Sequence, residues 1–380
     1  TIMAKNHLDY LIIGPAYPFR GGIADTQHEL ARALQKRGKE IELLTFTKLY
    51  PKVIFPGKTQ LSDQNIPERL TITQQIHAYN PTKWIRTIRY ICSRAPKVVV
   101  FRYYTPFLAL CYAWIARNLP NSIKKVAIVD NWIPHETSWI DKKLNLLFSK
   151  YLDCMSTLSL FVANQIKDNF DGPVWAGFHP INNNLLPVLD QKQARLKLNW
   201  EIDVPYVLFF GLIRKYKGLE LLIKAFNEAP LIDKNIKLYV AGECYEDKNK
   251  YTEIIEKLNL GKRVILDFNF KNKIDIQLLF SACDIVAQTY HKATQSGVTP
   301  IAYYYQKPLL VSDIESLKAT IITDHTGITV KKDSKSIAEG IYKILDKNNI
   351  NNYSENMRKT SIKYNWSTFS EQWDSFVSEV

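Results

Sequence analysis

Two basic residues, Arg214 and Lys217, occupy a short loop between an apolar run and an amphipathic one. The run YVLFFG (206–211) predicts a buried strand, and GLELLIKAFNEA (218–229) predicts a helix that begins just after the loop. Cations at the carboxyl end of a strand suit a diphosphate when a helix start offers free backbone N–H groups beside them. The loop is a candidate diphosphate site, with a solvated basic turn as the alternative.

A second candidate loop lies near the start of the sequence, where PAYPFRGG follows the apolar run DYLIIG (9–14). Gly21 and Gly22 open an amphipathic helix over 23–38, and a helix start without Cβ atoms lets an anion approach the backbone amides. The spacing is not GxGxxG, so no nicotinamide site is predicted. A tight turn before a helix is the alternative.

The stretch VDNWIPHET (129–137) places Asp130 and His135 just after the apolar run KKVAIV (124–129). Polar groups at a strand end are typical of active sites in parallel sheets, so both residues are candidate catalytic groups. A structural histidine with satisfied hydrogen bonds is the alternative.

The stretch ATQSGVTPIAYYYQKP (293–308) follows the apolar run DIVAQ (284–288) and contains no acidic residue. Small and hydroxylic side chains favour a helix start whose free N–H groups point outward. The candidate donor-binding residues here are Thr294, Gln295, Ser296, Gly297 and Val298. A helix with an ordinary cap is the alternative.

The charge is concentrated in the first half of the chain. Residues 1–180 hold 23 Lys and Arg against 13 Asp and Glu, and residues 69–129 hold ten basic residues and no acid. A one-sided positive field attracts phosphates on nucleic acid, on lipid or on a substrate. No RNA-binding signature accompanies it, so no nucleic-acid partner is expected.

Three of these basic residues recur at helical spacing in PTKWIRTIRYI (81–91). Lys83, Arg86 and Arg89 alternate with Trp84 and other apolar residues. This combination suits an anionic membrane surface or an acceptor-binding face. A core helix with a solvated basic edge is the alternative.

Alternating strand and helix patterns predict the α/β class, with two Rossmann-like, doubly wound parallel sheets facing a central cleft. The linker candidate is 171–203. We predict an N-terminal domain over 1–190 plus an aromatic C-terminal helix at 361–380, and a second domain over 191–360.

Composition also bounds the location of the protein. Its five cysteines lie far apart without metal-like spacing, which is typical of thiols in a reducing compartment. No signal-peptide pattern opens the sequence, and it has no apolar run of about 18 residues that could span a bilayer. We expect a cytoplasmic protein, with peripheral attachment at the inner face of the cytoplasmic membrane as a further hypothesis.

Together these stretches resemble the retaining glycosyltransferases of the GT-B fold, family 4, including bacterial members with DNxxPHE and TQSG motifs. The motifs in order are the Gly21–Gly22 loop, the basic loop, VAGECYED (240–247) and the stretch 284–313. The resemblance implies an N-terminal domain for the acceptor and a C-terminal domain for the nucleotide. It also places Gly242 among the donor-binding residues.

Two departures from the family pattern bear on the site. Lys217 matches the family lysine, but the usual arginine position carries Leu212, which makes Arg214 the implied substitute. The family's two glutamates, eight positions apart, correspond to Ala293 and Ile301. A frequent family histidine corresponds to Asp130, so that His135 is the implied replacement.

The resemblance implies transfer of a sugar from a nucleotide-diphosphate sugar to a lipid-linked, polysaccharide or other glycan acceptor, as in polysaccharide biosynthesis. It implies a hexosyltransferase that retains the anomeric configuration, with neither metal nor cofactor. A degenerate binding protein and a nucleotide-sugar epimerase of the same architecture are the alternatives.

Overall fold

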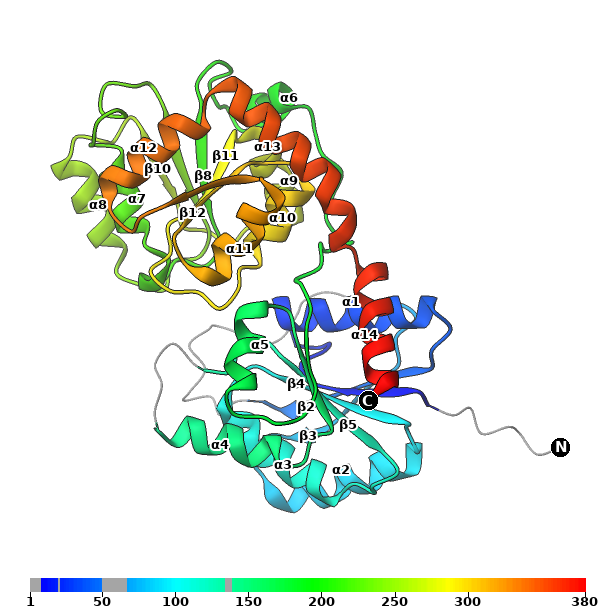
Figure 1. Cartoon of the computed structure of the whole chain (residues 1–380). Coiled ribbons are helices and arrows are strands. Elements are labelled where there is room, and N and C mark those ends of the chain that lie inside the picture. Colours follow the sequence, from blue (N-terminus) through cyan, green and yellow to red (C-terminus); the bar gives the residue numbers. More distant parts are fainter. Residues whose placement is uncertain (1–7, 20, 50–66, 134–138) are drawn as a thin grey trace. The chain divides into compact units, whose positions relative to one another are not determined.

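The structure is a computed structural model that describes residues 8–19, 21–49, 67–133 and 139–380. The chain divides into an N-terminal unit, which extends to His179 and includes Trp366–Val380, and a C-terminal unit, Pro180–Asn365 (Figure 1). The predicted boundaries differ from these. The first was predicted after residue 190, later than the observed one after His179, and the second after residue 360, earlier than the observed one after Asn365. Within the C-terminal unit, the residues next to the two boundaries are paired, since the Ile181 N–H donates to the Tyr364 carbonyl at 2.7 Å.

A parallel sheet of seven strands forms the centre of the described N-terminal unit, in the order β3-β2-β1-β4-β5-β6-β7. The strands are β1 (Tyr10–Ile13), β2 (Ile41–Lys48), β3 (Ile72–His77), β4 (Val98–Tyr103), β5 (Lys124–Val129), β6 (Cys154–Thr157) and β7 (Val174–Ala176). The helices are α1 (Gly22–Lys36), α2 (Pro81–Arg94), η1 (Pro106–Leu108), α3 (Ala109–Asn118), α4 (Trp139–Ser149), α5 (Leu160–Lys167) and α14 (Trp366–Glu379).

Both faces of this sheet are covered, because successive strand side chains point to opposite sides. Leu11 and Ile13 pack with residues of α2, α3, α4 and α5, whereas Tyr10 and Ile12 pack with residues of α1 and α14. Helix α14 lies beside α1 (Figure 1). The Tyr10 hydroxyl donates to Asp374 at 2.5 Å, and these contacts fasten the last helix to the first strand.

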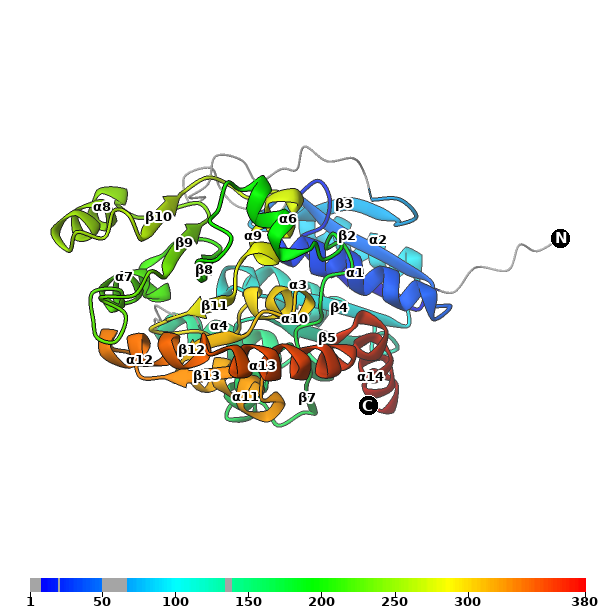
Figure 2. The same cartoon turned by 90° about the horizontal axis from the view of Figure 1, so that it is seen from above.

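The described C-terminal unit is built on a second parallel sheet of six strands, in the order β10-β9-β8-β11-β12-β13. The strands are β8 (Tyr206–Phe210), β9 (Lys237–Ala241), β10 (Val264–Asp267), β11 (Ile285–Gln288), β12 (Leu309–Ser312) and β13 (Gly327–Val330). The helices are α6 (Gln191–Lys197), η2 (Lys215–Lys217), α7 (Leu219–Ala225), α8 (Lys248–Lys257), α9 (Lys273–Ala282), α10 (Val298–Tyr304), α11 (Glu315–Asp324), α12 (Ser334–Ile344), α13 (Lys347–Thr360) and η3 (Ser361–Tyr364). Helices α7 and α12 lie side by side (Figure 2).

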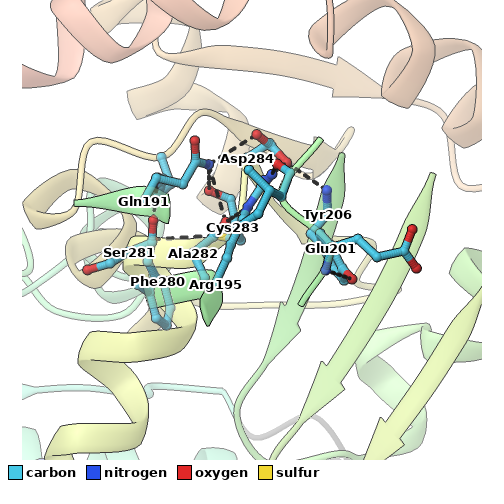
Figure 3. Close-up of polar contacts among 11 residues, drawn as sticks. Gln191, Arg195, Glu201, Tyr206, Phe280, Ser281, Ala282, Cys283 and Asp284 are labelled. Carbon is cyan, nitrogen blue, oxygen red and sulfur yellow. Dashed lines mark hydrogen bonds and ion pairs between the residues drawn. The ribbon is translucent and has the colours of Figure 1, made fainter. Parts of the chain in front are cut away.

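A buried polar network fastens α6 to the two central strands of this sheet (Figure 3). The Arg195 guanidinium donates to the Ala282 carbonyl at 3.0 Å and to the Asp284 carboxylate at 2.7 Å. Asp284 also accepts the Tyr206 backbone N–H, and Gln191 donates to the Asp284 side chain at 3.1 Å. The network holds the starts of β8 and β11 together, and the loops at the opposite ends of these strands carry the candidate site.

Candidate functional site

Strands β8 and β11 define the switch point of the C-terminal sheet. The chain leaves β8 toward β9 on one side, while β11 begins the strands on the other side. The loops that follow two such strands diverge, and ligands of open parallel sheets bind between them. Here those loops are 211–218 and 289–297. The predicted basic loop and much of the predicted donor loop therefore lie at one place in the fold.

Close backbone contacts join these two loops. The His291 N–H donates to the Tyr216 carbonyl at 2.6 Å, and the Thr289 hydroxyl donates to the Gly218 carbonyl at 3.2 Å. Gly218 has a φ of +65°, and a Cβ at this position would lie 2.0 Å from the Thr289 oxygen. Glycine is required here on both counts. The loop geometry around Lys217 is therefore set by backbone contacts.

Lys217 is buried at the centre of this switch point. Burial lowers the pKa of its ammonium, and the nearby Arg214 guanidinium lowers this pKa further. Its Nζ lies 5.3 Å from the centre of the Tyr290 ring and 3.0 Å from where a Cβ on Gly211 would stand. Among the described residues, none forms a hydrogen bond or an ion pair with this ammonium. A buried charge in this state is unfavourable until an anion binds it.

Arg214 lies on the same loop and also lacks a carboxylate partner among the described residues. Its guanidinium stacks on the Tyr245 ring, with 5.0 Å between Cζ and the ring centre. The loop is held against the segment after β9, because the Ile213 N–H donates to the Glu243 carbonyl at 2.8 Å. Arg214 and Lys217 thus form a fixed cationic pair that would favour an anion with more than one charge.

Gly242, which was predicted to bind the donor, also has a structural role. Its φ is +137°, and a Cβ there would lie 2.2 Å from the Gly211 carbonyl oxygen. Gly211 itself donates its N–H to the Ala241 carbonyl at 3.0 Å. Gly242 therefore permits close packing of the loops after β8 and β9, and so positions the Arg214 loop.

The predicted donor loop differs from expectation at its helix start. Helix α10 begins at Val298, with Gly297 as its N-cap and no side-chain cap, so the prediction that Thr294, Gln295 and Ser296 begin a helix is wrong. Pro300 lies in the first turn of α10, where its missing N–H removes no hydrogen bond within the helix.

Several groups of this loop nevertheless face the switch point. The Val298 Cγ2 atom lies 3.6 Å from the Cβ position on Gly211. Ser296 hydrogen-bonds Tyr290, and burial raises the pKa of this tyrosine to about 12, so the phenol stays protonated. The Gln295 Oε1 atom is buried without a hydrogen-bond partner. Gln295 thus has an acceptor that no described residue uses.

The two positions that lack the family's glutamates are both described by the structure. Ala293 is buried, and its carbonyl accepts from the Ser316 hydroxyl at 2.6 Å. Ile301 lies on α10 and packs against the core of the unit. Both positions are therefore occupied by apolar packing.

In the N-terminal unit, Gly21 and Gly22 lie at the start of α1. Gly21 is its N-cap with a φ of +120°, and a Cβ on either glycine would meet no atom within 4 Å. The preceding loop is fixed by His28, whose Nε2 accepts the Tyr17 N–H at 3.0 Å. The glycines thus present open backbone at a helix start, as predicted, and no described contact fills the space beside them.

His28 gives the N-terminal unit a predicted pH dependence. Burial lowers the pKa of this imidazole from 6.5 to about 4, and Arg32 lowers it further. The unfolded chain binds a proton here below pH 6.5 whereas the folded chain does not, so stability should fall as pH drops from 6.5 to 4. The expected loss is about 2–3 kcal/mol, since each unit of pKa corresponds to about 1.4 kcal/mol.

Urea unfolding at several pH values measures this effect. His28→Gln keeps an acceptor for Tyr17 without an ionisable ring, and it should reduce the slope of stability between pH 6.5 and 4. An unchanged slope in the variant would assign the acid sensitivity to another group.

Asp130, predicted to be catalytic, forms a buried ion pair in the structure. Its two carboxylate oxygens accept from Arg102 at 2.6 and 2.7 Å, and both side chains are only 2% exposed. This pairing gives Asp130 a structural role in the N-terminal unit, and its catalytic role stays a prediction. His135 lies outside the described residues. No cluster of three His, Cys, Asp or Glu residues that could hold a metal occurs in the described part of the chain.

The predicted membrane or acceptor face on α2 is corrected at one residue. Trp84 is buried, and its indole N–H donates to the His77 carbonyl at 2.9 Å, so it belongs to the core beneath the helix. Lys83, Arg86 and Arg89 are exposed on the outer face. None of the helices described is both long and apolar enough to cross a bilayer.

Sequence reasoning missed two residues of the switch point, Gly211 and Tyr290. Gly211 directly follows β8, and Tyr290 follows β11 after one residue. Their position after a strand end was a usable signal, but their proximity to Lys217 depends on β8 and β11 being neighbours.

Solved structures with the same architecture define the class of this fold. A sucrose-phosphate synthase from Thermosynechococcus elongatus superposes with a TM-score of 0.76 at 17% identity, over 98% of both chains. The HepE protein of Anabaena, solved in complex with UDP and glucose, gives a TM-score of 0.75 at 14% identity over 98% of this chain and all of that one. The two parallel-sheet units and these neighbours confirm the predicted GT-B fold.

The sequence comparisons narrow the class within this fold. Residues 190–364 match the family model described as Glycosyl transferases group 1, and this match covers the switch-point loops. An uncharacterized glycosyltransferase of Methanocaldococcus jannaschii is 26% identical over 250 residues, which are 60% of this chain and 58% of that protein. The chain thus aligns with less than two thirds of this relative. Together the matches support a glycosyltransferase of the GT-B fold.

Proposed function

We propose that the protein is a retaining glycosyltransferase that moves a sugar from a nucleotide-diphosphate sugar to a lipid-linked or glycan acceptor. The observation that carries this proposal is the buried ammonium of Lys217, which pairs with no residue that the structure describes and lies beside Arg214 in the region that matches the glycosyltransferase model. The UDP and glucose in the HepE structure support a nucleotide sugar as donor. Membership of family 4 rests on the motif order.

The proposed reaction needs no covalent intermediate. The bond from the anomeric carbon to the diphosphate oxygen breaks, and the acceptor oxygen bonds to the same face of that carbon. The acceptor's proton passes to the leaving diphosphate. Lys217 and Arg214 stabilise the charge that builds on the diphosphate, and fixed donors of this kind are usually the largest catalytic contribution. No metal takes part in this proposal.

The donor assignment is tested with the full-length protein. UDP and a panel of nucleotide sugars should raise the melting temperature, because a ligand that binds only the folded state stabilises it. A bound nucleotide sugar should release nucleoside diphosphate with an acceptor, and NMR of the product should show the donor's anomeric configuration. Binding without turnover would identify a binding protein, and an epimerised sugar formed without an acceptor would identify an epimerase.

Peripheral attachment to the inner face of the cytoplasmic membrane is part of this proposal. Helix α4 exposes Trp139 at 68% and Ile140 at 50%, and the Lys143 ammonium lies 4.6 Å from the centre of the Trp139 ring. Aromatic and basic side chains on one helix suit a headgroup region. Co-sedimentation with anionic liposomes should weaken as salt rises. If the protein does not bind anionic liposomes at low salt, peripheral attachment is contradicted.

A further inference from the structure

A cavity of about 460 Å³ lies within the N-terminal unit, at the carboxyl ends of β2 and β3. Lys48 enters it from the end of β2, Gln75 and His77 from β3, and Lys83 and Arg86 from the first two turns of α2. We call this cavity the β2–β3 pocket. Its size is that of sites for small ligands.

The cations of the β2–β3 pocket are unpaired. Lys48, Lys83 and Arg86 form no ion pair with any described residue, and no Asp or Glu of the described ranges lines the pocket. The other end of α2 is different, because Arg94 bonds the buried Glu42 carboxylate at 2.6 Å. At the C-terminal end of α2, Arg94 is therefore neutralised. Near its N-terminal end, Lys83 and Arg86 have no acidic partner among the described residues.

The position of these cations on α2 is unfavourable without an anion. The N-terminus of a helix carries a partial positive charge, which favours acidic side chains in the first turn and disfavours basic ones. The first turn of α2 holds no acid, and Lys83 stands three residues after the N-cap, Asn80. A bound anion would relieve this repulsion and would also meet the charges of Lys48 and Arg86.

His77 adds a hydrogen-bonding group to the pocket. Its Nδ1 atom is buried without a hydrogen-bond partner. Burial lowers the pKa of this imidazole, and Lys48 and Lys83 lower it further. Its backbone is fixed, since the His77 carbonyl accepts from Trp84, and its ring packs 4.5 Å from the Tyr79 ring. The imidazole is thus held in place with an unused nitrogen.

From these observations we propose that the β2–β3 pocket binds the phosphate of a phosphorylated acceptor. The inference rests on the proposed function, because it assigns the acceptor's chemical class. Three cations without an acidic partner among the described residues match the charge of a phosphate monoester or a diphosphate, and the neutral imidazole adds a hydrogen-bonding group. The phosphate belongs either to a sugar phosphate in solution or to the headgroup of a lipid-linked acceptor.

Calorimetric titration with inorganic phosphate and pyrophosphate tests the pocket itself. The titrations use the full chain with Lys217→Ala, so that anion binding at the switch point of the other unit does not contribute. The double variant Lys83→Gln/Arg86→Gln should weaken binding at least about tenfold, since it removes two charge-assisted contacts to the anion. Both side chains are exposed, so the fold should survive.

The matched control is Arg117→Gln/Lys142→Gln. These residues are exposed on the same unit, lie outside the pocket and carry the same total charge. The control should keep phosphate affinity within about twofold, because charges farther apart than about 10 Å are screened. Equal weakening by both double variants would reduce the effect to net charge and overturn the proposal, as would equal affinity in all three proteins.

Two further titrations distinguish the sources of the phosphate. One uses glucose 6-phosphate, and the other uses phosphatidylcholine vesicles with or without a polyprenyl phosphate. Binding that depends on Lys83 and Arg86 in either titration supports the proposal and names the source. If neither glucose 6-phosphate nor the polyprenyl phosphate binds, the proposal is overturned, even where inorganic phosphate binds.

The proposed function fails separately from this inference. It fails if the chain with Lys217 intact neither binds UDP nor turns over a nucleotide sugar, and the phosphate titrations still report on the pocket. The converse outcome is a variant Lys83→Gln/Arg86→Gln that hydrolyses the donor as before and binds phosphate with unchanged affinity. This outcome would overturn the assignment of the β2–β3 pocket and leave the proposed function standing.

Discussion

Lys217→Ala should lower sugar transfer about 10²–10³-fold, because it removes a preorganised charge at the site of the leaving diphosphate. The substitution should not lower the melting temperature of the ligand-free protein. Lys217 is buried, and no described residue pairs with its ammonium, so its loss relieves an unfavourable buried charge. Nucleoside diphosphate release at saturating donor measures the first effect, and thermal unfolding measures the second.

Lys215→Ala is the matched control for this prediction. Lys215 lies on the same short helix, η2, and carries the same charge, but its side chain is exposed. The control should keep transfer within about twofold of the parent, since an exposed charge is screened by solvent and salt. Wild-type turnover in Lys217→Ala would remove the diphosphate assignment, and equal losses in both variants would point to long-range attraction of the donor.

The fold could be predicted from the sequence because buried parallel strands consist of short apolar runs that lie between helices. Strands such as β1, β5 and β8 follow this rule, and their predicted positions agree with the structure. Strand β3 (ITQQIH) is mainly polar, and β7 (VWA) has only three residues, so neither carries the pattern. Both lie at edges of the sheet, where burial is less complete.

The basic loop was predictable, but its surroundings were not. Arg214 and Lys217 could be found because they follow a strand directly. The contacts of Lys217 with Gly211 and Tyr290 depend on strand order, which pairs β8 with β11 across 70 residues or more of intervening chain. A sequence pattern gives the direction of a strand and not its neighbour, so this pairing had to come from the structure.

Trp84 shows a signal that was present in the sequence and given the wrong meaning. The buried residues of α2 are Trp84, Thr87 and Ile91, which recur every three or four positions on one face. Lys83, Arg86 and Arg89 follow a second series on the opposite side. The tryptophan therefore belongs to the inward series, and the cations belong to the exposed one.

Asp130→Ala should destabilise the N-terminal unit by about 3–5 kcal/mol, because it leaves the Arg102 guanidinium buried without a counterion. Urea unfolding followed by tryptophan fluorescence is suited to this measurement, since every tryptophan except Trp200 lies in that unit. Lys97→Ala, which breaks the exposed pair with Asp9, should cost at most about 1 kcal/mol.

A double variant separates the buried ion pair from any catalytic role of the carboxylate. Arg102→Met/Asp130→Leu removes both charges and should recover most of the stability lost in Asp130→Ala, because apolar replacements of a buried pair are often neutral. If Asp130 only supports the fold, sugar transfer should recover with stability in this variant. A stable double variant without transfer would show instead that the carboxylate takes part in the reaction. The double variant is needed because Asp130 directly follows β5, and the sequence pattern at a strand end fits a structural carboxylate as well as a catalytic one.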